Sequence, residues 1–161
     1  MKNKHLPIFG FGPIYITVII LFTALVIYLS ATNHIPFIGI KELKHLFLVF
    51  GAFCIALGIF LWINAAIFSK GDASIKNNKL LTTGIYAYVR NPVYSAFMLI
   101  CTGIIFTHSN IVLMFLPFVY WLFMTILMKY TEEKWLLKLY GQEYIDYCKM
   151  VNRCIPWIRR E

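Results

Sequence analysis

Four long apolar stretches without a charged side chain constrain the fold of this 161-residue chain more than any other feature. They cover residues 12–30, 46–68, 93–107 and 111–128. A helix of about 20 apolar residues crosses the hydrocarbon core of a bilayer. Only 14% of the residues are charged, against about 25% in soluble domains. We therefore expect an all-α integral membrane protein with about four transmembrane helices, forming a single membrane domain over residues 1–161 with an N-terminal two-helix part over 1–68.

The lengths of these stretches predict individual features. The first exceeds the apolar region of about 7 to 15 residues in a signal peptide, which favours an uncleaved helix. The third, at about 15 residues or 22 Å of helix, is short for a core of about 30 Å. Three residues separate it from the fourth, so these two helices should form a tight antiparallel hairpin. Pro117 is expected to kink the fourth helix.

The positive charges are distributed asymmetrically between the two sides of this arrangement. Of the 15 lysines and arginines, all but Lys41 and Lys44 fall on the side of the two termini and of the loop 69–92. Short loops rich in lysine and arginine face the cytoplasm, so both termini are expected there in a multi-pass protein. Anionic lipid accounts for the net charge of +8, and no nucleic-acid-binding motif is present.

Cysteine and histidine provide no recognisable site. None of the four cysteines forms a C-x-x-C pair or stands at zinc-ligand spacing from a histidine, so reduced structural cysteines are expected. The four histidines fall at the predicted membrane boundaries, which argues against a catalytic histidine. No metal site is predicted.

The end of the loop 69–92 has a clear local pattern. Asn91 is a favourable N-cap residue and Pro92 suits the first helical position, so the third helix should begin there. Its free backbone N–H groups and positive dipole end would face the cytoplasm, where a carboxylate could dock. Arg90 adds a permanently charged, forked donor. A simpler interpretation remains open, in which Arg90 is only a membrane-boundary anchor beside a helix start.

Two adjacent carboxylates, Glu132 and Glu133, follow the fourth stretch directly. Carboxylates this close to a membrane are costly unless they pair or bind something. The alternative is a solvated pair that opens an amphipathic surface helix, with its apolar side chains on lipid. This alternative explains the helix but not why the pair lies on the same side of the membrane as Arg90.

These elements together resemble a known family. Gly84-Ile85-Tyr86, Arg90-Asn91-Pro92-Val93-Tyr94, Glu132-Glu133, the segment 140–144 (YGQEY) and Ile155-Pro156 are similar to the G-x-Y, R-H-P-x-Y, E-E and F-G-x-E-Y elements of isoprenylcysteine carboxyl methyltransferases. Phospholipid N-methyltransferases share part of the pattern. The resemblance covers residues 78–161, the expected methyltransferase core.

The resemblance implies a small helical membrane protein in which the cytoplasmic loop and a C-terminal amphipathic helix close over S-adenosylmethionine, with an opening on the lipid side. It implies Arg90 as the candidate catalytic residue. By position, it implies ten cofactor contacts: Asn78, Lys79, Leu80, Leu81, Tyr86, Asn91, Pro92, Val93, Tyr94 and Glu132. In this scheme Glu132 accepts the ribose hydroxyls, and Glu133 should matter less.

Three positions depart from the family pattern. Asn91 replaces the usual histidine, but an amide can still donate a hydrogen bond. Met128 stands where the family has an arginine that orients the substrate, and Gly71 stands where it has a glutamine. Lys129, adjacent to Met128, lies about 100° around the helix from it. The resemblance therefore supports cofactor binding better than it supports any particular acceptor.

The predicted function is the transfer of a methyl group from S-adenosylmethionine to a lipophilic small molecule or membrane lipid, whose acceptor group is a carboxylate, thiol or amine. Two alternatives stay open. A sterol-reductase-like enzyme would share the C-terminal half and use NADPH, although such enzymes have more spans. A non-enzymatic scaffold or transporter subunit would have no cofactor affinity. The sequence predicts neither the identity of the acceptor nor the oligomeric state.

Overall fold

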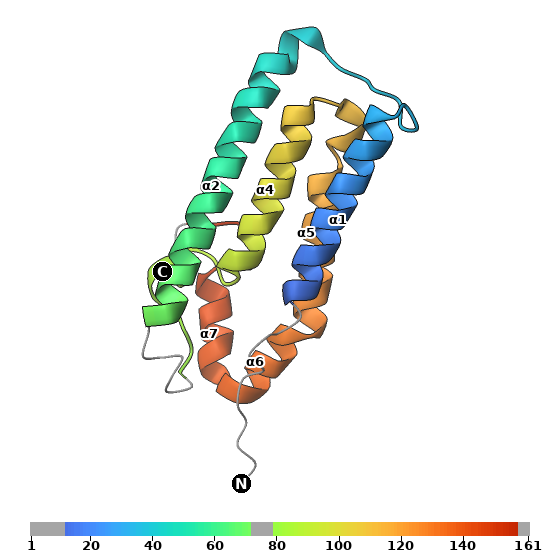
Figure 1. Ribbon diagram of the computed structural model, residues 1–161. Coiled ribbons are helices and arrows are strands. Elements are labelled where there is room, and N and C mark those ends of the chain that lie inside the picture. The colour runs from blue at the N-terminus through green and yellow to red at the C-terminus, as the bar shows by residue number, and fades with distance from the viewer. Residues whose placement is uncertain (1–11, 72–78, 158–161) are drawn as a thin grey trace.

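The computed structural model describes residues 12–71 and 79–157, with the backbone alone for residues 68–71. The described residues are helical and connecting segments without a strand, so the predicted all-α class is confirmed. Figure 1 shows the arrangement. The α-helices are α1 (Gly12–Ala31), α2 (Lys44–Gly71), α4 (Pro92–His108), α5 (Leu116–Tyr130), α6 (Glu132–Tyr140) and α7 (Gln142–Met150), and the 3₁₀ turns are η1 (Lys41–Leu43), η2 (Gly84–Ala87) and η3 (Ile111–Leu113).

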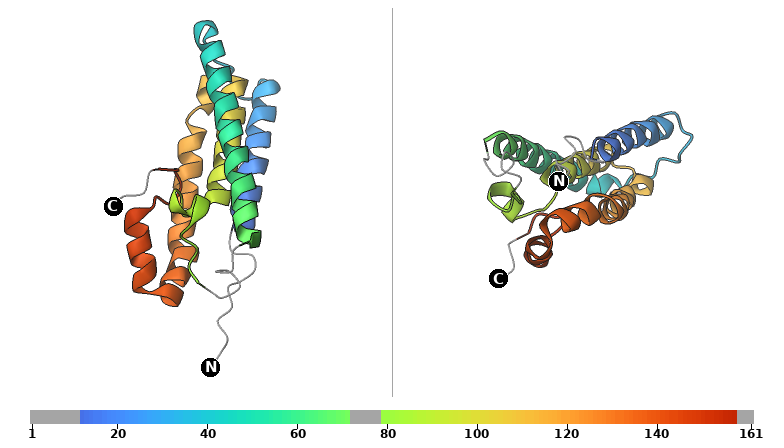
Figure 2. Two further views of the ribbon diagram at one scale, coloured as in Figure 1. Left: turned by 90° about the vertical axis from the view of Figure 1, so that its left-hand side faces the viewer. Right: turned by 90° about the horizontal axis from the view of Figure 1, so that it is seen from below.

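Helices α1, α2, α4 and α5 run alongside one another, and α6 and α7 lie at one end of this bundle (Figures 1 and 2). Within residues 12–71 and 79–157, three helical segments are long and apolar enough to cross a membrane: Gly12–Ala31, Lys41–Ile67 and Ile111–Tyr140. The fourth apolar helix, Pro92–His108, is shorter, as the sequence predicted. Four complete spans therefore remain a prediction.

Small residues allow α2 and α4 to pack closely. A Cβ atom added to Gly51 would lie 2.7 Å from the backbone oxygen of Gly103, and one added to Gly58 would lie 2.7 Å from that of Ala96. Gly51 and Gly58 are seven residues apart on α2, and Ala96 and Gly103 are seven residues apart on α4, so both contacts lie along one seam. Membrane helices associate through close backbone approach at small residues, because in lipid there is no hydrophobic driving force between helices. This seam positions the start of α4.

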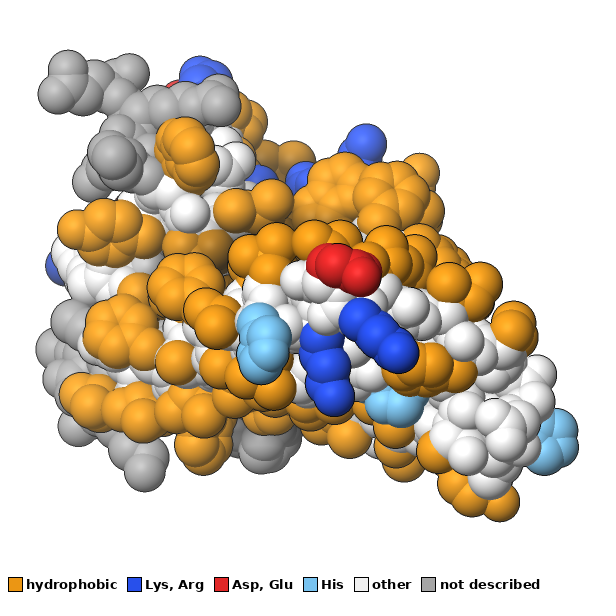
Figure 3. Space-filling model, turned by 90° about the horizontal axis from the view of Figure 1, so that it is seen from above, with side chains coloured by type: hydrophobic (Ala, Val, Ile, Leu, Met, Phe, Trp, Pro, Cys, Tyr) orange, Lys and Arg blue, Asp and Glu red, His pale blue; other side chains and the backbone are white. Residues whose placement is uncertain are grey.

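Buried hydrogen bonds join the other helices. The hydroxyl groups of Thr23 and Tyr120 are 2.8 Å apart and connect α1 with α5. At the end where α1 stops, Asn110 donates to the Ser30 hydroxyl at 2.9 Å, and the His108 ring lies 3.0 Å from the same oxygen. The surface seen from this end is mostly hydrophobic with few charged side chains (Figure 3). His108 thus has a structural role here, far from the loop 79–91.

The predicted kink at Pro117 is corrected, because the fourth apolar stretch is not one continuous helix and is interrupted just before the proline. The α-helix begins at Leu116, so Pro117 lies in its first turn. Before it stands the separate turn η3, in which the Asn110 side chain accepts a hydrogen bond from the Val112 backbone at 3.1 Å. Proline has no backbone N–H, and in the first turn of a helix that group would have no helical partner in any case.

The expected single C-terminal amphipathic helix is divided in two, which corrects the sequence prediction. Gly141 separates α6 from α7 with φ +56° and ψ −124°. This conformation is readily adopted only by glycine, because any Cβ would be strained there. The chain reverses at this point, and α7 turns back toward the bundle (Figures 1 and 2).

After α7 the chain runs beside the loop that precedes α4. The Arg90 backbone N–H donates to the Asn152 carbonyl at 2.9 Å, and the Trp157 N–H donates to the Tyr88 carbonyl at 3.1 Å. This C-terminal segment therefore borders the region in which the sequence places the site. Of the four cysteines, all are free thiols, as expected.

Candidate functional site

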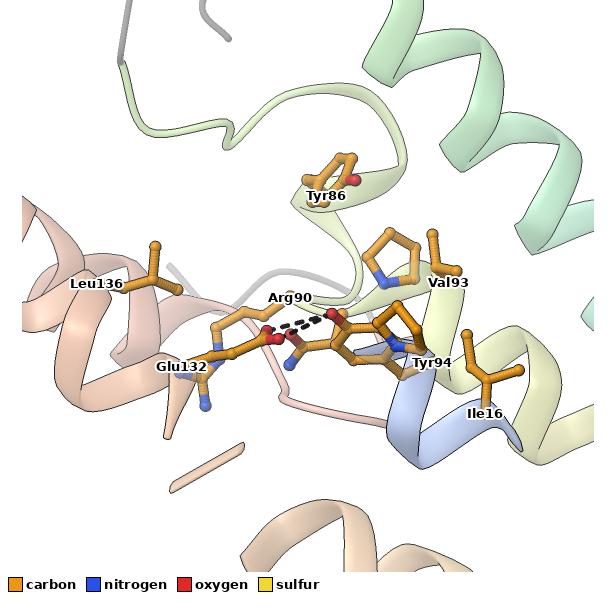
Figure 4. Close-up of a pocket in the computed structure, with 10 residues that line it drawn as sticks. Ile16, Tyr86, Arg90, Val93, Tyr94, Glu132 and Leu136 are labelled. Carbon is orange, nitrogen blue, oxygen red and sulfur yellow. Dashed lines mark hydrogen bonds between the residues drawn. The ribbon is translucent and has the colours of Figure 1, made fainter. Parts of the chain in front are cut away.

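A cavity of about 370 Å³ opens where the start of α4 meets α1, η2 and α6. Its size falls within the range of about 300–1,000 Å³ that is typical of small-molecule sites. Figure 4 shows the side chains around it. The residues that line it are Pro13, Ile16, Tyr86, Arg90, Asn91, Pro92, Val93, Tyr94, Glu132 and Leu136.

Six of the ten cofactor residues implied by the family resemblance line this cavity together with Arg90: Tyr86, Asn91, Pro92, Val93, Tyr94 and Glu132. The segment 79–81 does not. Leu80 instead packs against the cluster of Tyr144, Tyr147 and Val151. Asn78 lies outside the described residues. Among the described residues, the structure thus brings the six positions from η2, the start of α4 and α6 into one cavity, and the segment 79–81 is not among the residues that line it; a cofactor role for any of them stays a prediction.

Three lining residues were not found from the sequence. Pro13 and Ile16 come from the first turns of α1, and Leu136 comes from α6. All three are apolar residues in apolar or amphipathic helices, so they give no signal of their own. Because Pro13 and Ile16 belong to a membrane helix, they provide the cavity with an apolar wall beside the bilayer.

Glu132 is held across the cavity by Tyr94. The Tyr94 hydroxyl lies 3.0 Å from one carboxylate oxygen of Glu132 and 3.3 Å from the other (Figure 4). The Tyr94 ring also packs closely against the start of α1, where a Cβ atom on Gly12 would overlap it. An ionised carboxylate accepts several hydrogen bonds, so Glu132 is chemically suited to a ligand hydroxyl as well as to Tyr94.

Asn91 stands at the predicted N-cap position of α4, but its side chain does not cap the helix. The helix begins as expected, with the Ser95 N–H donating to the Asn91 carbonyl at 3.0 Å. The Asn91 amide instead donates to the Arg153 carbonyl at 3.1 Å. The capping prediction was therefore wrong. The C-terminal segment lies close enough to accept the hydrogen bond of the amide, so the Asn91 side chain does not satisfy the backbone N–H groups in the first turn of α4.

Glu133 lies between two arginines. Its carboxylate is 3.2 Å from Arg90 Nη1 and accepts hydrogen bonds from Arg153 Nε and from Arg153 Nη2, the latter at 2.8 Å. The side chains are 9% exposed for Arg90, 15% for Glu133 and 24% for Arg153. Burial this deep makes each charge depend on its partners. The ion triad joins the start of α4, the start of α6 and the C-terminal segment.

Arg90 has further neighbours beyond this triad. Its Nη1 donates to the Tyr144 hydroxyl at 3.3 Å and contacts the Cys148 sulfur. Its buried Nε has no hydrogen-bond partner within the described part of the chain. Buried donors are normally paired. Because Arg90 lines the cavity, this unpaired N–H is consistent with a site for an anionic ligand group.

The phenols around the site are neutral across the physiological range. Burial raises the pKa of Tyr86 above its ordinary value. Burial, and secondly the Glu133 charge, raise the pKa of Tyr144 well above its ordinary value, although Arg90 acts in the opposite direction. The Tyr86 carbonyl accepts a 2.6 Å hydrogen bond from Tyr147, which attaches the η2 turn to α7. These phenols can therefore donate hydrogen bonds but do not act as bases.

Met128 and Lys129, which the resemblance singled out for acceptor binding, do not line the cavity. Met128 is fully buried in the core cluster that also contains Tyr120 and Met124. Lys129 lines a different pocket, between α6 and α7. Neither residue supplies a charge to the cavity at the start of α4.

Comparison with known proteins gives two matches. The family described as phospholipid methyltransferase matches residues 43–143, more than half of the chain. The protein-S-isoprenylcysteine O-methyltransferase of Schizosaccharomyces pombe is 38% identical over 84 residues, which cover 52% of this chain and 35% of that protein. The matched stretch thus represents about a third of the length of the relative. No solved structure matches significantly.

Proposed function

Because the chain belongs to the phospholipid methyltransferase family, we propose that it transfers a methyl group from S-adenosylmethionine to a lipophilic acceptor within the membrane. Methyltransferases of this family use S-adenosylmethionine and are multi-pass integral membrane proteins. The observation that carries the proposal is the cavity in which Arg90, Tyr94 and Glu132 meet at the start of α4. The match to the phospholipid methyltransferase family over residues 43–143 confirms the family predicted from the sequence motifs.

The residues of the cavity fit the cofactor. S-adenosylmethionine has a carboxylate, a ribose diol, an aromatic base and a cationic sulfonium. The Nε of Arg90, which has no partner within the described residues, and the positive N-terminal end of α4, which the Asn91 side chain does not cap, suit the carboxylate. Glu132 suits the diol as a hydrogen-bond acceptor. The ring faces of Tyr86 and Tyr94 suit the base or the cation.

When bound, the cofactor would supply an electrophilic methyl group, with its thioether as the leaving group. The chain's own contribution is positioning. Arg90 and Glu132 would orient the two polar ends of the cofactor, while Pro13, Ile16 and Leu136 keep the acceptor side apolar and exclude water. Proton transfer to a histidine base is not required before the attack if the acceptor is already ionised, or if it is a neutral amine whose ammonium product loses its proton to solvent afterwards.

Ligand-induced stabilisation tests this function. S-adenosylmethionine should raise the unfolding temperature of the detergent-solubilised protein in a concentration-dependent way, because a ligand that binds only the folded state stabilises it by mass action. NADPH at the same concentrations should not. Stabilisation by NADPH alone would favour a reductase, and stabilisation by neither ligand would favour a scaffold.

We infer from Met128 that the acceptor group does not carry a carboxylate. A thioether cannot provide the charge-assisted bidentate contact that an arginine makes with a carboxylate. Lys129 lines another pocket, and Arg90 is engaged by Glu133. Among the described residues that line the cavity, no cation besides Arg90 is present to pair with a carboxylate of the acceptor. The acceptor side thus offers apolar contacts.

An acceptor comparison checks this inference. The purified protein should methylate a long-chain amine faster than a prenylcysteine carboxylate of similar size, by about tenfold or more if one charge-assisted contact is missing. Initial rates with both acceptors at saturating cofactor measure the ratio. Lys129→Gln should leave the ratio unchanged. A faster rate on the carboxylate would show that Met128 carries no information about the acceptor.

We also propose that both termini face the cytoplasm. The support is the concentration of lysine and arginine at the end of the bundle that holds α6, α7 and the loop before α4. A cysteine introduced at the exposed position Asp146 should react with a membrane-impermeant maleimide only after the cells are permeabilised. A cysteine introduced in place of Lys41 should react with the same reagent in intact cells. The reverse labelling pattern would invert this orientation.

A further inference from the structure

A second pocket, distinct from the cavity at the start of α4, lies between the end of α5 and the helices α6 and α7. Its volume is about 500 Å³. The residues that line it are Lys129, Tyr130, Glu133, Lys134, Leu137, Tyr144, Ile145, Cys148 and Lys149. Three lysines from three different helices therefore border one pocket, which the proposed methyl transfer does not use.

The pocket has a net positive character because its acidic group is already neutralised. Glu133 is the one carboxylate among the lining residues, and it is paired with Arg90 and Arg153 behind the pocket wall. Asp146, nearby on α7, pairs with Lys149 at 2.8 Å, but both of these side chains are more than half exposed. Exposed pairs of this kind hold their charges weakly, so Lys149 can turn to another anion.

The pocket also lies at the level of the end of α5, where lysines follow the uncharged apolar stretch 111–128. Lys129 occupies the last turn of α5, which belongs to the last membrane-crossing segment. Exposed apolar side chains accompany the lysines: Tyr130 is 62% exposed, Leu137 43% and Ile145 38%. Tyrosine and lysine beside apolar residues are typical of the interface between hydrocarbon and headgroups. The reversal at Gly141 brings α7 back toward this level (Figure 2).

We propose that this pocket binds the phosphate headgroup of an anionic phospholipid. Lysine ammonium groups bind phosphate as point charges, and Lys129, Lys134 and Lys149 surround one pocket that a headgroup can enter from the bilayer. The exposed Leu137 and Ile145 provide contacts for the glycerol and the first acyl carbons, which a free phosphate would not use. The bound lipid would connect α5 to α7 and hold the helix pair against the membrane. The proposal does not depend on methyl transfer.

Lipid titration of the detergent-solubilised protein tests the site. Phosphatidylglycerol should raise the unfolding temperature more than phosphatidylcholine does, and native mass spectrometry should show retained phosphatidylglycerol. The triple variant Lys129→Gln, Lys134→Gln, Lys149→Gln should lose about tenfold or more in apparent affinity for phosphatidylglycerol. The triple variant in which the same three lysines are replaced with arginine keeps the positive charges and should retain binding. Retained binding would show that these three positions tolerate substitution.

A matched control separates a site from general charge. Lys41→Gln, Lys44→Gln, Lys138→Gln removes three exposed lysines that do not line the pocket and changes the net charge equally. This control should bind phosphatidylglycerol as the unmodified protein does. The proposal is overturned if both triple variants lose binding equally, if the pocket variant keeps it, or if inorganic phosphate alone produces the full stabilisation.

Discussion

Replacing Glu132 with alanine should reduce the affinity for S-adenosylmethionine by about tenfold to a hundredfold, while leaving the fold intact. In the proposed site this carboxylate accepts the ribose hydroxyls, and a desolvated hydroxyl without a partner costs about 1–3 kcal/mol. The side chain lines the cavity and accepts a hydrogen bond from the Tyr94 hydroxyl, whereas the ion triad is built on the neighbouring Glu133. Calorimetric titration of the purified variant measures the affinity directly.

Tyr94→Phe is the matched control for this experiment. It removes the hydroxyl that donates to Glu132 but keeps the carboxylate and the aromatic ring. We expect a smaller loss of affinity, because only the orientation of Glu132 is relaxed. If Glu132→Ala binds the cofactor as tightly as the unmodified protein, Glu132 is not a cofactor residue and the cavity needs another assignment.

Replacing Glu133 with alanine should instead destabilise the protein by about 3–5 kcal/mol, because two largely buried arginines would face each other without their shared carboxylate. The charge repulsion would separate the C-terminal segment from the start of α4. Thermal unfolding in detergent without cofactor measures the loss. Cofactor affinity should fall only as far as the fold is weakened, since Glu133 does not line the cavity at the start of α4.

A double-mutant cycle isolates this ion triad from other effects. Arg153→Met alone leaves one arginine paired with Glu133, so we expect a smaller loss of stability than for Glu133→Ala. Combining Glu133→Ala with Arg153→Met should cost less than the sum of the two single changes, because the second change removes an unpaired charge that the first creates. Strictly additive losses would show that Glu133 and Arg153 do not stabilise one another.

The sequence by itself determined the features that depend on neighbouring residues. Uncharged apolar stretches of membrane length predict the helices, because a bilayer core leaves no partner for an unpaired backbone group. Asn91-Pro92 marks the start of α4, because proline is tolerated in the first turn and rarely beyond it. The motifs around Arg90 and Glu132 identify the family and most of the residues that line the cavity.

Only the tertiary structure decided which of these residues contact one another. Asn91 donates to the Arg153 carbonyl, 62 positions along the chain, rather than capping α4. Glu133, which resembles its neighbour Glu132 in sequence, faces the arginines and not the cavity. The physical reason is geometric: consecutive helix residues point about 100° apart. Adjacent glutamates therefore meet different partners, and only the packing of α6 against α4 and the C-terminal segment selects them.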